Sequence, residues 1–138
     1  GSQYLSLINQ ETTGTQPVVD LLMESRLQET ILTGIQGGLI QSARAVGAGG
    51  IAVSIAKSFG KNAQLGARIH FSRKLKIDEL LFGETQGLVI VTIKETDLME
   101  FERVCMTIGI PATTIGRVTD DGVFSFNEAI KLPVSKLV

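Results

Sequence analysis

The sequence predicts a single α/β domain in which helices pack on a mixed sheet. Three observations support this prediction. Apolar residues recur at helical spacing before several glycines, β-branched runs occur elsewhere, and helical and strand-like segments alternate along most of the chain. With 138 residues the chain is long enough for one domain with a substantial core, and we expect residues 1–138 to form that domain.

The first half of the chain is expected to contain two helices with one strand between them. Apolar residues recur on one helical face over residues 17–35, and a glycine pair ends that segment. The predicted apolar face comprises Val18, Leu21, Leu22, Ile31, Leu32 and Ile35. Residues 39–46 are expected to form a short buried strand, and the apolar spacing of residues 51–59 indicates the second helix.

The middle of the chain predicts two strands and two helices. Residues 63–71 alternate in their second half between apolar and polar side chains, as in a strand with one solvated face. A short helix is expected around residues 77–81, before a turn at Gly83. Residues 87–93 are almost wholly apolar and rich in β-branched side chains, which predicts a central strand covered on both faces. Residues 96–109 show the clearest amphipathic helical pattern.

The last part of the chain is expected to be mostly strand. Residues 111–119 and 122–127 have strand character, and the Asp-Asp-Gly turn between them predicts that they form an antiparallel hairpin. Residues 128–138 are expected to add a last strand and the start of a truncated helix. The expected order is therefore α-β-α-β-α-β-α-β-β-β, which favours a mixed sheet with packed helices.

The composition narrows the class of function. The 13 Lys and Arg residues nearly balance the 14 Asp and Glu residues, so no broad basic field points to nucleic acid. No apolar run is long enough to span a membrane, and the N-terminal segment lacks the pattern of a signal peptide. One cysteine and one histidine give no disulfide and no basis for a histidine-rich metal site. We therefore assign no catalytic residue and no metal ligand, and we expect a cytoplasmic location.

A glycine-rich loop is the first candidate binding site. It lies in the stretch SARAVGAGGIAVSIAKSF and contains Gly47, Gly49 and Gly50 directly before an expected helix. Glycines allow a ligand to approach backbone N–H groups, and the positive end of a helix favours an anion such as phosphate. Arg44, just before the loop, could add a guanidinium. The alternative is a tight strand-to-helix corner without a ligand, because neither GxGxxG nor a P-loop is present.

The second candidate site is the segment LFGETQG. Its polar residues Glu84 and Gln86 directly precede the most apolar strand, where they would either bind a ligand or satisfy backbone groups at the start of that strand. Four further candidate residues are expected to have structural or solvated roles. These residues are His70, Cys105, Asp120 and Asp121.

Several segments together resemble one known family. In order along the chain they are GSQYL, SARAVGAGGIAVSIAKS, LLFGETQGLVIVTIKETDLMEF and GIPATTIGRVTDDG. This ordered set resembles the last domain of the phosphoribosylformylglycinamidine synthase family, which belongs to purine biosynthesis, and the resemblance runs essentially end to end. It implies that the chain is the C-terminal domain of a larger synthase. It also implies an aminoimidazole ribonucleotide (AIR) synthetase-type C-terminal domain, an α/β sandwich with partly ferredoxin-like topology.

The resemblance also implies an activity and partners for the whole synthase. Members of the family convert formylglycinamide ribonucleotide to the amidine with ATP, magnesium and ammonia from glutamine. The main ATP, magnesium and catalytic residues lie in upstream domains, so this domain is expected to hold no cofactor and to be inactive alone. Its expected partners are those upstream domains and a glutaminase domain or subunit, with a homodimer as a further option. The alternative is a non-catalytic nucleotide- or phosphate-binding or structural domain of a related ATP-using synthetase, such as AIR synthetase, selenophosphate synthetase or thiamine-monophosphate kinase.

The glycine loop is where the chain departs from the family pattern. The family's His-Asp-Val-Ser-Asp-Gly-Gly aligns with residues 44–50, and only the valine and the glycine pair are kept. Arginine replaces the histidine, alanines replace both aspartates and glycine replaces the serine. Because alanine can neither coordinate magnesium nor transfer a proton, a backbone role remains. We therefore expect valine at Gly47 or Gly50 to damage folding more than Arg44→Ala does.

Overall fold

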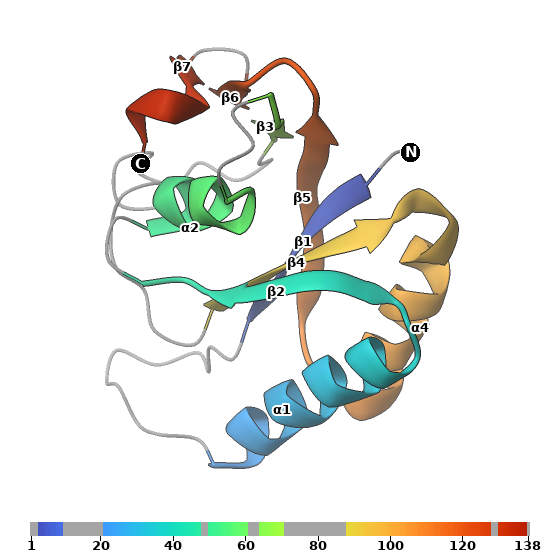
Figure 1. Ribbon diagram of the computed structural model, residues 1–138. Coiled ribbons are helices and arrows are strands. Elements are labelled where there is room, and N and C mark those ends of the chain that lie inside the picture. The colour runs from blue at the N-terminus through green and yellow to red at the C-terminus, as the bar shows by residue number, and fades with distance from the viewer. Residues whose placement is uncertain are drawn as a thin grey trace.

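The computed structural model describes residues 3–9, 21–47, 50–60, 64–70, 88–127 and 130–137 (Figure 1). These residues form a seven-stranded mixed sheet in the order β2-β4-β1-β5-β3-β6-β7, with helices on both faces. The predicted class, a mixed sheet with packed helices, is confirmed. The strands are β1 (Gln3–Asn9), β2 (Ile40–Ala45), β3 (Gly66–Ile69), β4 (Leu88–Lys94), β5 (Ala112–Thr119), β6 (Val123–Phe126) and β7 (Ile130–Pro133). The helices are α1 (Leu21–Gln36), α2 (Gly50–Ser58) and α4 (Leu98–Ile108), with 3₁₀ turns at Glu95–Asp97 and Val134–Lys136.

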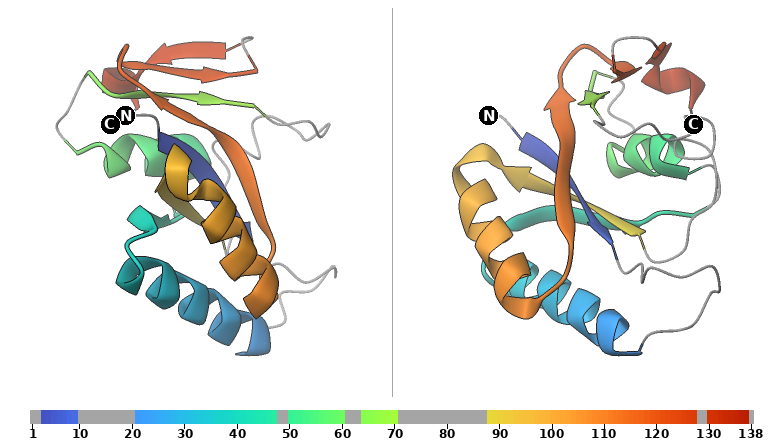
Figure 2. Two further views of the ribbon diagram at one scale, coloured as in Figure 1. Left: turned by 90° about the vertical axis from the view of Figure 1, so that its right-hand side faces the viewer. Right: turned by 180° about the vertical axis from the view of Figure 1, so that it is seen from behind.

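One half of the sheet has ferredoxin-like topology. The segments β1-α1-β2 and β4-α4-β5 are two βαβ units that interlock, since β4 lies between β1 and β2 while β1 lies between β4 and β5. All three strand pairs in this half are antiparallel. This is the ferredoxin-like arrangement, and the helices α1 and α4 lie side by side over it (Figures 1 and 2). The partly ferredoxin-like expectation is therefore confirmed, with α2, β3, β6 and β7 as additions.

The sheet separates two apolar clusters. One cluster lies on the α2 face and contains Leu5, Leu7, Val46, Ile51, Ala52, Ile55, Ala56, Ala67, Ile69, Leu88, Ile90, Ile115, Phe124, Phe126 and Val134. The other lies on the face covered by α1 and α4 and contains Ile8, Ile40, Val89, Val91, Ile93, Phe101, Cys105 and Ile110. Strand β4 supplies side chains to both clusters, so the prediction that residues 87–93 contain a strand covered on both faces is confirmed.

Strand β1 was not predicted from the sequence. It lies between β4 and β5, with Leu5 and Leu7 in the α2 cluster and Ile8 in the other cluster. Ser6 is also buried, and its hydroxyl is 3.5 Å from that of Thr114. A strand covered on both faces does not show a simple apolar–polar alternation, which explains why the pattern of this segment is weak.

The strand at residues 40–45 was predicted correctly, but its predicted burial is wrong. In the part of the chain that the structure describes, β2 pairs only with β4 and forms an edge of the sheet. Ile40 is buried, whereas Gln41, Arg44 and Ala45 are exposed. An edge strand has a neighbour on one side only, so most of its side chains keep contact with water.

The predicted apolar face of the first helix is correct only for Ile31, and Val18 of that face lies outside the described residues. Leu21, Leu22, Leu32 and Ile35 point to solvent with exposed fractions between 54% and 74%. The residues that pack toward the sheet are Met23, Leu27 and Ile31, together with the fully buried Thr30 and Gly34. The helix is therefore rotated about its axis relative to the face that apolar spacing indicates.

Two small side chains explain this rotation of α1. The Thr30 hydroxyl donates a hydrogen bond to the Arg26 carbonyl oxygen at 2.8 Å, so its polar group is satisfied while buried. Gly34 lies directly against Ile40, since a Cβ on Gly34 would be 2.6 Å from Cγ1 of Ile40. Small side chains let the helix approach β2 closely, which leaves the large apolar residues on the outer side.

The hairpin predicted between residues 111–119 and 122–127 is wrong. Strand β3 lies between β5 and β6, antiparallel to the first and parallel to the second. The turn itself forms as predicted, with Gly122 at a φ of 67° and its N–H donating to the Gln64 carbonyl oxygen at 2.8 Å. The chain therefore crosses over the end of β3, and the antiparallel pair near the C-terminal end is β6 with β7.

The Asp121 carboxylate holds this turn in a pH-dependent way. Thr119 donates its hydroxyl to Oδ1 of Asp121 at 2.6 Å, and the Val123 N–H donates to the same oxygen at 3.1 Å. These hydrogen bonds, the first being the stronger cause, lower the pKa of Asp121 below its ordinary value.

We expect Asp121→Asn to destabilise the chain by less than about 1 kcal/mol at pH 7, because the carboxylate is exposed. A carboxyl group whose pKa is lower in the folded state than in the unfolded state stabilises the fold at pH values above its unfolded-state pKa. This stabilisation is lost as the pH falls through its folded-state pKa. The difference in unfolding free energy between the parent and Asp121→Asn should therefore shrink below about pH 4. Urea unfolding of the parent and of Asp121→Asn at pH 7 and pH 3 measures this difference. An equal difference at the two pH values would show that the charge of Asp121 does not stabilise the turn.

Candidate functional site

The predicted glycine loop is a corner between β2 and α2. The chain stays on the sheet as far as Val46, whose N–H donates to the Leu88 carbonyl oxygen at 2.9 Å. Helix α2 begins at Gly50, whose N–H donates to the Gly47 carbonyl oxygen at 3.0 Å. The corner is thus anchored on both sides by backbone hydrogen bonds.

Helix α2 is fixed firmly beneath this corner. Its buried residues are Gly50, Ile51, Ala52, Ser54, Ile55 and Ala56. The first turn carries no acidic side chain, and the first N–H groups of a helix have no acceptor within the helix itself. The start of α2 therefore has the partial positive charge that favours an anion.

Arg44 lies on the same face of the sheet as α2. It pairs with Ile90 of β4, and Ile90 is a member of the α2 cluster. Directly paired residues of neighbouring strands point to the same face, so the register places Arg44 on the α2 side of the edge strand. The structure thus brings Arg44, Gly47 and Gly50, three of the predicted site residues, to one side of the sheet.

A hydroxyl pair next to Arg44 was missed by reasoning from the sequence. Ser42 and Thr92 are partners on β2 and β4, and their hydroxyl oxygens are 2.7 Å apart. Ser42 is two residues before Arg44 and therefore shares its face. The signal lies in the strand register, which shifts between Ile40 and Ser42 and cannot be read from composition.

The remaining predicted residues add no chemistry to this corner. Gly49, Glu84 and Gln86 lie outside the described residues. His70 is exposed. Cys105 is buried, and desolvation, with a smaller effect of Glu102, raises the pKa of its thiol to about 11, so the thiol is unreactive at neutral pH.

Two kinds of feature are absent from the described part of the chain. Within it, no three His, Cys, Asp or Glu side chains come together in a way that could hold a metal ion. None of the helices described by the structure is long and apolar enough to cross a membrane.

Comparison with known families decides the class of domain. Residues 1–127 match the family described as "AIR synthase related protein, C-terminal domain". The chain belongs to this family. The AIR synthase related domain thus accounts for nearly all of the sequence, in agreement with the resemblance drawn from its motifs.

The curated relatives of this AIR synthase related domain are much longer proteins. The phosphoribosylformylglycinamidine synthase subunit PurL of Symbiobacterium thermophilum is 33% identical over 156 residues, which cover all of this chain and 20% of the relative. PurL of Alkaliphilus metalliredigens is 36% identical over 118 residues, which cover 86% of this chain and 16% of the relative. The chain therefore spans about a fifth of the length of these relatives.

Solved structures show the same fold. The structure titled "T. maritima PurL complexed with AMPPCP" superimposes with a TM-score of 0.82 at 23% identity, over 98% of this chain and 25% of that one. Thiamine-monophosphate kinase from Stenotrophomonas maltophilia superimposes with a TM-score of 0.64 at 13% identity, over 91% of this chain and 50% of that one. The AIR synthase related domain therefore has its fold in common with both proteins.

The arrangement at the corner of the AIR synthase related domain limits its chemistry. Backbone N–H groups at the start of α2 and the guanidinium of Arg44 are donors and positive charges, which suit an anion. Ala45 and Gly47 supply no acid, base or metal ligand. Among the described residues, this corner offers hydrogen-bond donors and a positive charge that suit an anionic group, and Ala45 and Gly47 offer no side chain that transfers a proton.

The two described glycines of the corner should respond differently to substitution. Gly50 has a φ of 73°, a conformation that costs residues with a Cβ about 1–2 kcal/mol. Gly47 has no positive φ, and a Cβ there would meet no atom within 4 Å. We expect Gly50→Ala to destabilise the chain by about 1–2 kcal/mol and Gly47→Ala to change its stability by less than about 0.5 kcal/mol. Urea unfolding of both variants tests this, and equal losses would contradict it.

The expectation that valine at either glycine damages folding more than Arg44→Ala does is therefore kept for Gly50 and dropped for Gly47. A Cβ at Gly47 would meet no atom within 4 Å, so of these two positions only Gly50 has a backbone conformation that favours glycine.

Proposed function

We propose that this chain is the C-terminal AIR synthase-type domain of a phosphoribosylformylglycinamidine synthase and is inactive by itself. The observation that carries the proposal is the match of the whole chain to PurL, which bears that name, at 33% identity. The whole synthase would convert formylglycinamide ribonucleotide to the amidine with ATP and glutamine-derived ammonia. Because the chain spans about a fifth of such relatives, most of the active site would come from the rest of the protein.

The contribution of this domain would be to hold a phosphate group of the ribonucleotide. The open backbone at Gly47, the start of α2 and Arg44 all lie on one side of the sheet. A phosphate there would accept hydrogen bonds from backbone N–H groups and pair with the guanidinium. The fixed position of α2 on its apolar cluster would orient the substrate for groups supplied by other domains.

ATP and magnesium would act elsewhere in the synthase. The residues that the structure describes at the corner do not fit a magnesium site, because Ala45 and Gly47 carry no oxygen ligand in their side chains. We therefore place the nucleotide and the metal ion in the rest of the protein. The solved PurL complexes with ATP and AMPPCP establish nucleotide binding for that protein.

The partners would be the other domains of the same synthase and a source of ammonia. One structural relative is titled "Structure of PurLQS from Thermotoga maritima", which describes an assembly that includes PurL. We propose a glutaminase subunit or domain as the ammonia source and the cytoplasm as the location.

The kinase-type alternative has weaker support, because the likeness to thiamine-monophosphate kinase has the lower TM-score.

A chimaeric enzyme tests the proposal. The matching segment of Symbiobacterium thermophilum PurL would be replaced by this chain, and amidine formation would be measured with formylglycinamide ribonucleotide, ATP and ammonia. We expect the chimaera to be folded and active. In it, Arg44→Ala should raise the KM for the ribonucleotide about tenfold or more, because one charged hydrogen bond to the substrate is lost. Gly47→Val should also raise this KM, because it fills the open space over the corner.

The controls separate binding from folding. Arg103→Ala removes an arginine from the exposed side of α4, on the opposite face of the sheet, and should leave the KM unchanged. Thermal unfolding of each variant shows whether a KM change reflects lost stability. A folded chimaera without activity, or ATP hydrolysis by the isolated chain, would overturn the proposal.

A further inference from the structure

Three basic side chains, which we call the basic row, lie across one face of the sheet. They are Arg117 on β5, Arg68 on β3 and Lys131 on β7. The register pairs Arg117 with Arg68, Arg68 with Ser125 of β6, and Ser125 with Lys131. Directly paired residues share a face. Because neighbouring strands lie about 4.8 Å apart, the basic row extends over about 14 Å.

The basic row lies on the open side of this part of the sheet. Ile69 and Phe124 belong to the α2 cluster, so the adjacent residues Arg68 and Ser125 point to the opposite face. Among the described residues, the cluster under α1 and α4 contains no residue of β3, β6 or β7. Figure 2 shows both helices over the other half of the sheet. All three basic residues are exposed, so the described part of the chain leaves the basic row accessible.

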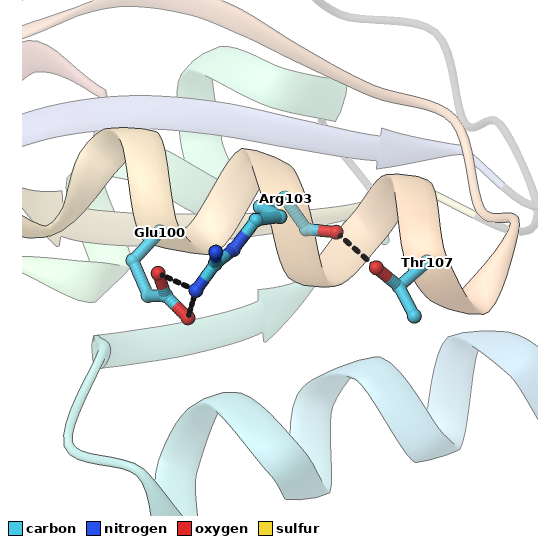
Figure 3. A network of polar contacts seen from close by, with 3 residues as sticks. All are labelled: Glu100, Arg103 and Thr107. Carbon is cyan, nitrogen blue, oxygen red and sulfur yellow. Dashed lines mark hydrogen bonds and ion pairs between the residues drawn. The ribbon is translucent and has the colours of Figure 1, made fainter.

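The charges of the basic row are not paired within the described part of the chain. Like charges at directly paired positions of neighbouring strands destabilise a sheet, and Arg68 and Arg117 are such a pair. An exposed arginine on α4 shows the contrast, since Nη2 of Arg103 donates to both carboxylate oxygens of Glu100, at 2.9 and 2.6 Å (Figure 3). Among the described residues, no carboxylate forms such an ion pair with the basic row.

Two carboxylates on the same side of the sheet have other hydrogen-bond partners. Asp121 accepts the hydroxyl of Thr119, and this hydrogen bond is the largest cause of the lowered pKa of Asp121, whereas attraction to Arg68 is the smallest. Glu102 accepts the hydroxyl of Thr114 at 3.4 Å. Neither carboxylate therefore neutralises the basic row.

The Arg117 guanidinium is held in place by an aromatic ring. It lies 5.4 Å from the ring centre of Tyr4, its partner on β1. Such a cation–π contact orients a guanidinium without adding a negative charge. The donors of Arg117 therefore stay available to an anion from outside the chain.

The carboxylates of an extended acidic segment match the basic row in chemistry and in spacing. A guanidinium binds a carboxylate through two parallel hydrogen bonds. In an extended segment, acidic residues at three alternate positions project to one side and span about 13 Å, close to the length of the basic row. A nucleic acid fits less well, because the chain has a formal net charge of −1 and no broad basic field.

We propose that the basic row binds the carboxylates of an extended acidic segment in the rest of the longer protein. This choice of partner rests on the proposed function, in which the chain is about a fifth of a synthase. Exposed ion pairs contribute little each, so the contact between separate molecules should have a dissociation constant in about the millimolar range. Tethering within one protein provides an effective concentration of about that size, which is enough to form the contact.

A peptide titration tests the chemistry on the 138-residue chain without relying on the proposed function. The probe is the blocked peptide Glu-Ser-Glu-Ser-Glu, and backbone amide shifts are followed by NMR up to about 10 mM peptide. We expect saturable shifts on β3, β5, β6 and β7 that weaken as salt is added. Arg68→Glu should raise the dissociation constant about tenfold, because it removes one ion pair and adds a repulsion. The neutral peptide Gln-Ser-Gln-Ser-Gln should not bind.

Two charge-removing variants are the controls for this titration. Arg103→Gln removes an exposed arginine from α4, and Lys57→Gln removes an exposed lysine from α2 on the other face of the sheet. Both keep the basic row and should leave the dissociation constant unchanged. An Arg68→Glu variant that binds the acidic peptide like the parent would overturn the proposal. A short single-stranded RNA that binds the basic row more tightly than the peptide would also overturn it.

The chimaera with PurL tests whether the acidic segment belongs to the same protein. In the isolated chain, Arg68→Glu replaces a repulsion with an attraction to Arg117, so its Tm should be equal to or higher than that of the parent. In the chimaera the same change should lower the Tm, because the contact with the acidic segment is lost, whereas Arg103→Gln should not. A chimaera that Arg68→Glu does not destabilise would overturn the proposed partner, while its activity reports separately on the proposed function.

Discussion

Gly116→Ala is expected to lower the unfolding free energy of this chain by about 3 kcal/mol or more. A Cβ at Gly116 on β5 would overlap the carbonyl oxygen of Arg68 on β3 and would lie 3.0 Å from Cα of Ile69. These are backbone atoms, so no side-chain rotation can relieve the overlap. Strand β5 would have to move away from β3, which would weaken the four register pairs between them. The loss should appear in urea unfolding followed by circular dichroism and as a fall in Tm of about 10 °C.

A second glycine gives an independent test of the same close approach. A Cβ at Gly66 on β3 would lie 2.6 Å from the backbone nitrogen of Val123 on β6, so Gly66→Ala should also be strongly destabilising. Gly47→Ala is the control, since a Cβ there would meet no atom within 4 Å. If Gly116→Ala unfolds within about 1 kcal/mol of Gly47→Ala, the placement of β3 between β5 and β6 would be contradicted.

These two glycines also show which features of the fold the sequence could not predict. The apolar run of β4 and the end of α4 at Gly109, with its φ of 88°, depend on neighbouring residues and were predicted correctly. The insertion of β3 between β5 and β6 depends on backbone contact between Gly66 and Val123, 57 positions apart. Nothing local to the Asp-Asp-Gly turn distinguishes a hairpin from a connection that crosses over another strand.

The candidate site likewise has some features that neighbouring residues determine and others that depend on residues far apart in the sequence. Glycine spacing was enough to locate the corner and its helix, because strand, turn and helix follow one another in sequence. The face on which Arg44 lies depends on pairing with Ile90 and on a shift of register before Ser42. The missed Ser42–Thr92 pair depends on that same register. The rotation of α1 likewise required the contact of Gly34 with Ile40.

Phe124→Ala and Phe101→Ala should each destabilise the chain by about 3–5 kcal/mol, because each removes a fully buried aromatic ring. Their effects on the corner should differ, however. Phe124 belongs to the α2 cluster together with Val46 and Ile51, whereas Phe101 belongs to the cluster under α1 and α4. A cavity in the α2 cluster should loosen the packing that fixes the start of α2.

Amide hydrogen exchange distinguishes these two effects. The Val46 and Gly50 amides report on the corner, since they donate to the carbonyl oxygens of Leu88 and Gly47. Local opening raises exchange where packing is weakened, in addition to the change expected from global stability. At matched global stability, obtained with a small amount of urea, these amides should exchange faster in Phe124→Ala than in Phe101→Ala. Equal exchange would show that both clusters open as one cooperative core, in which case the corner could not loosen independently of α1 and α4.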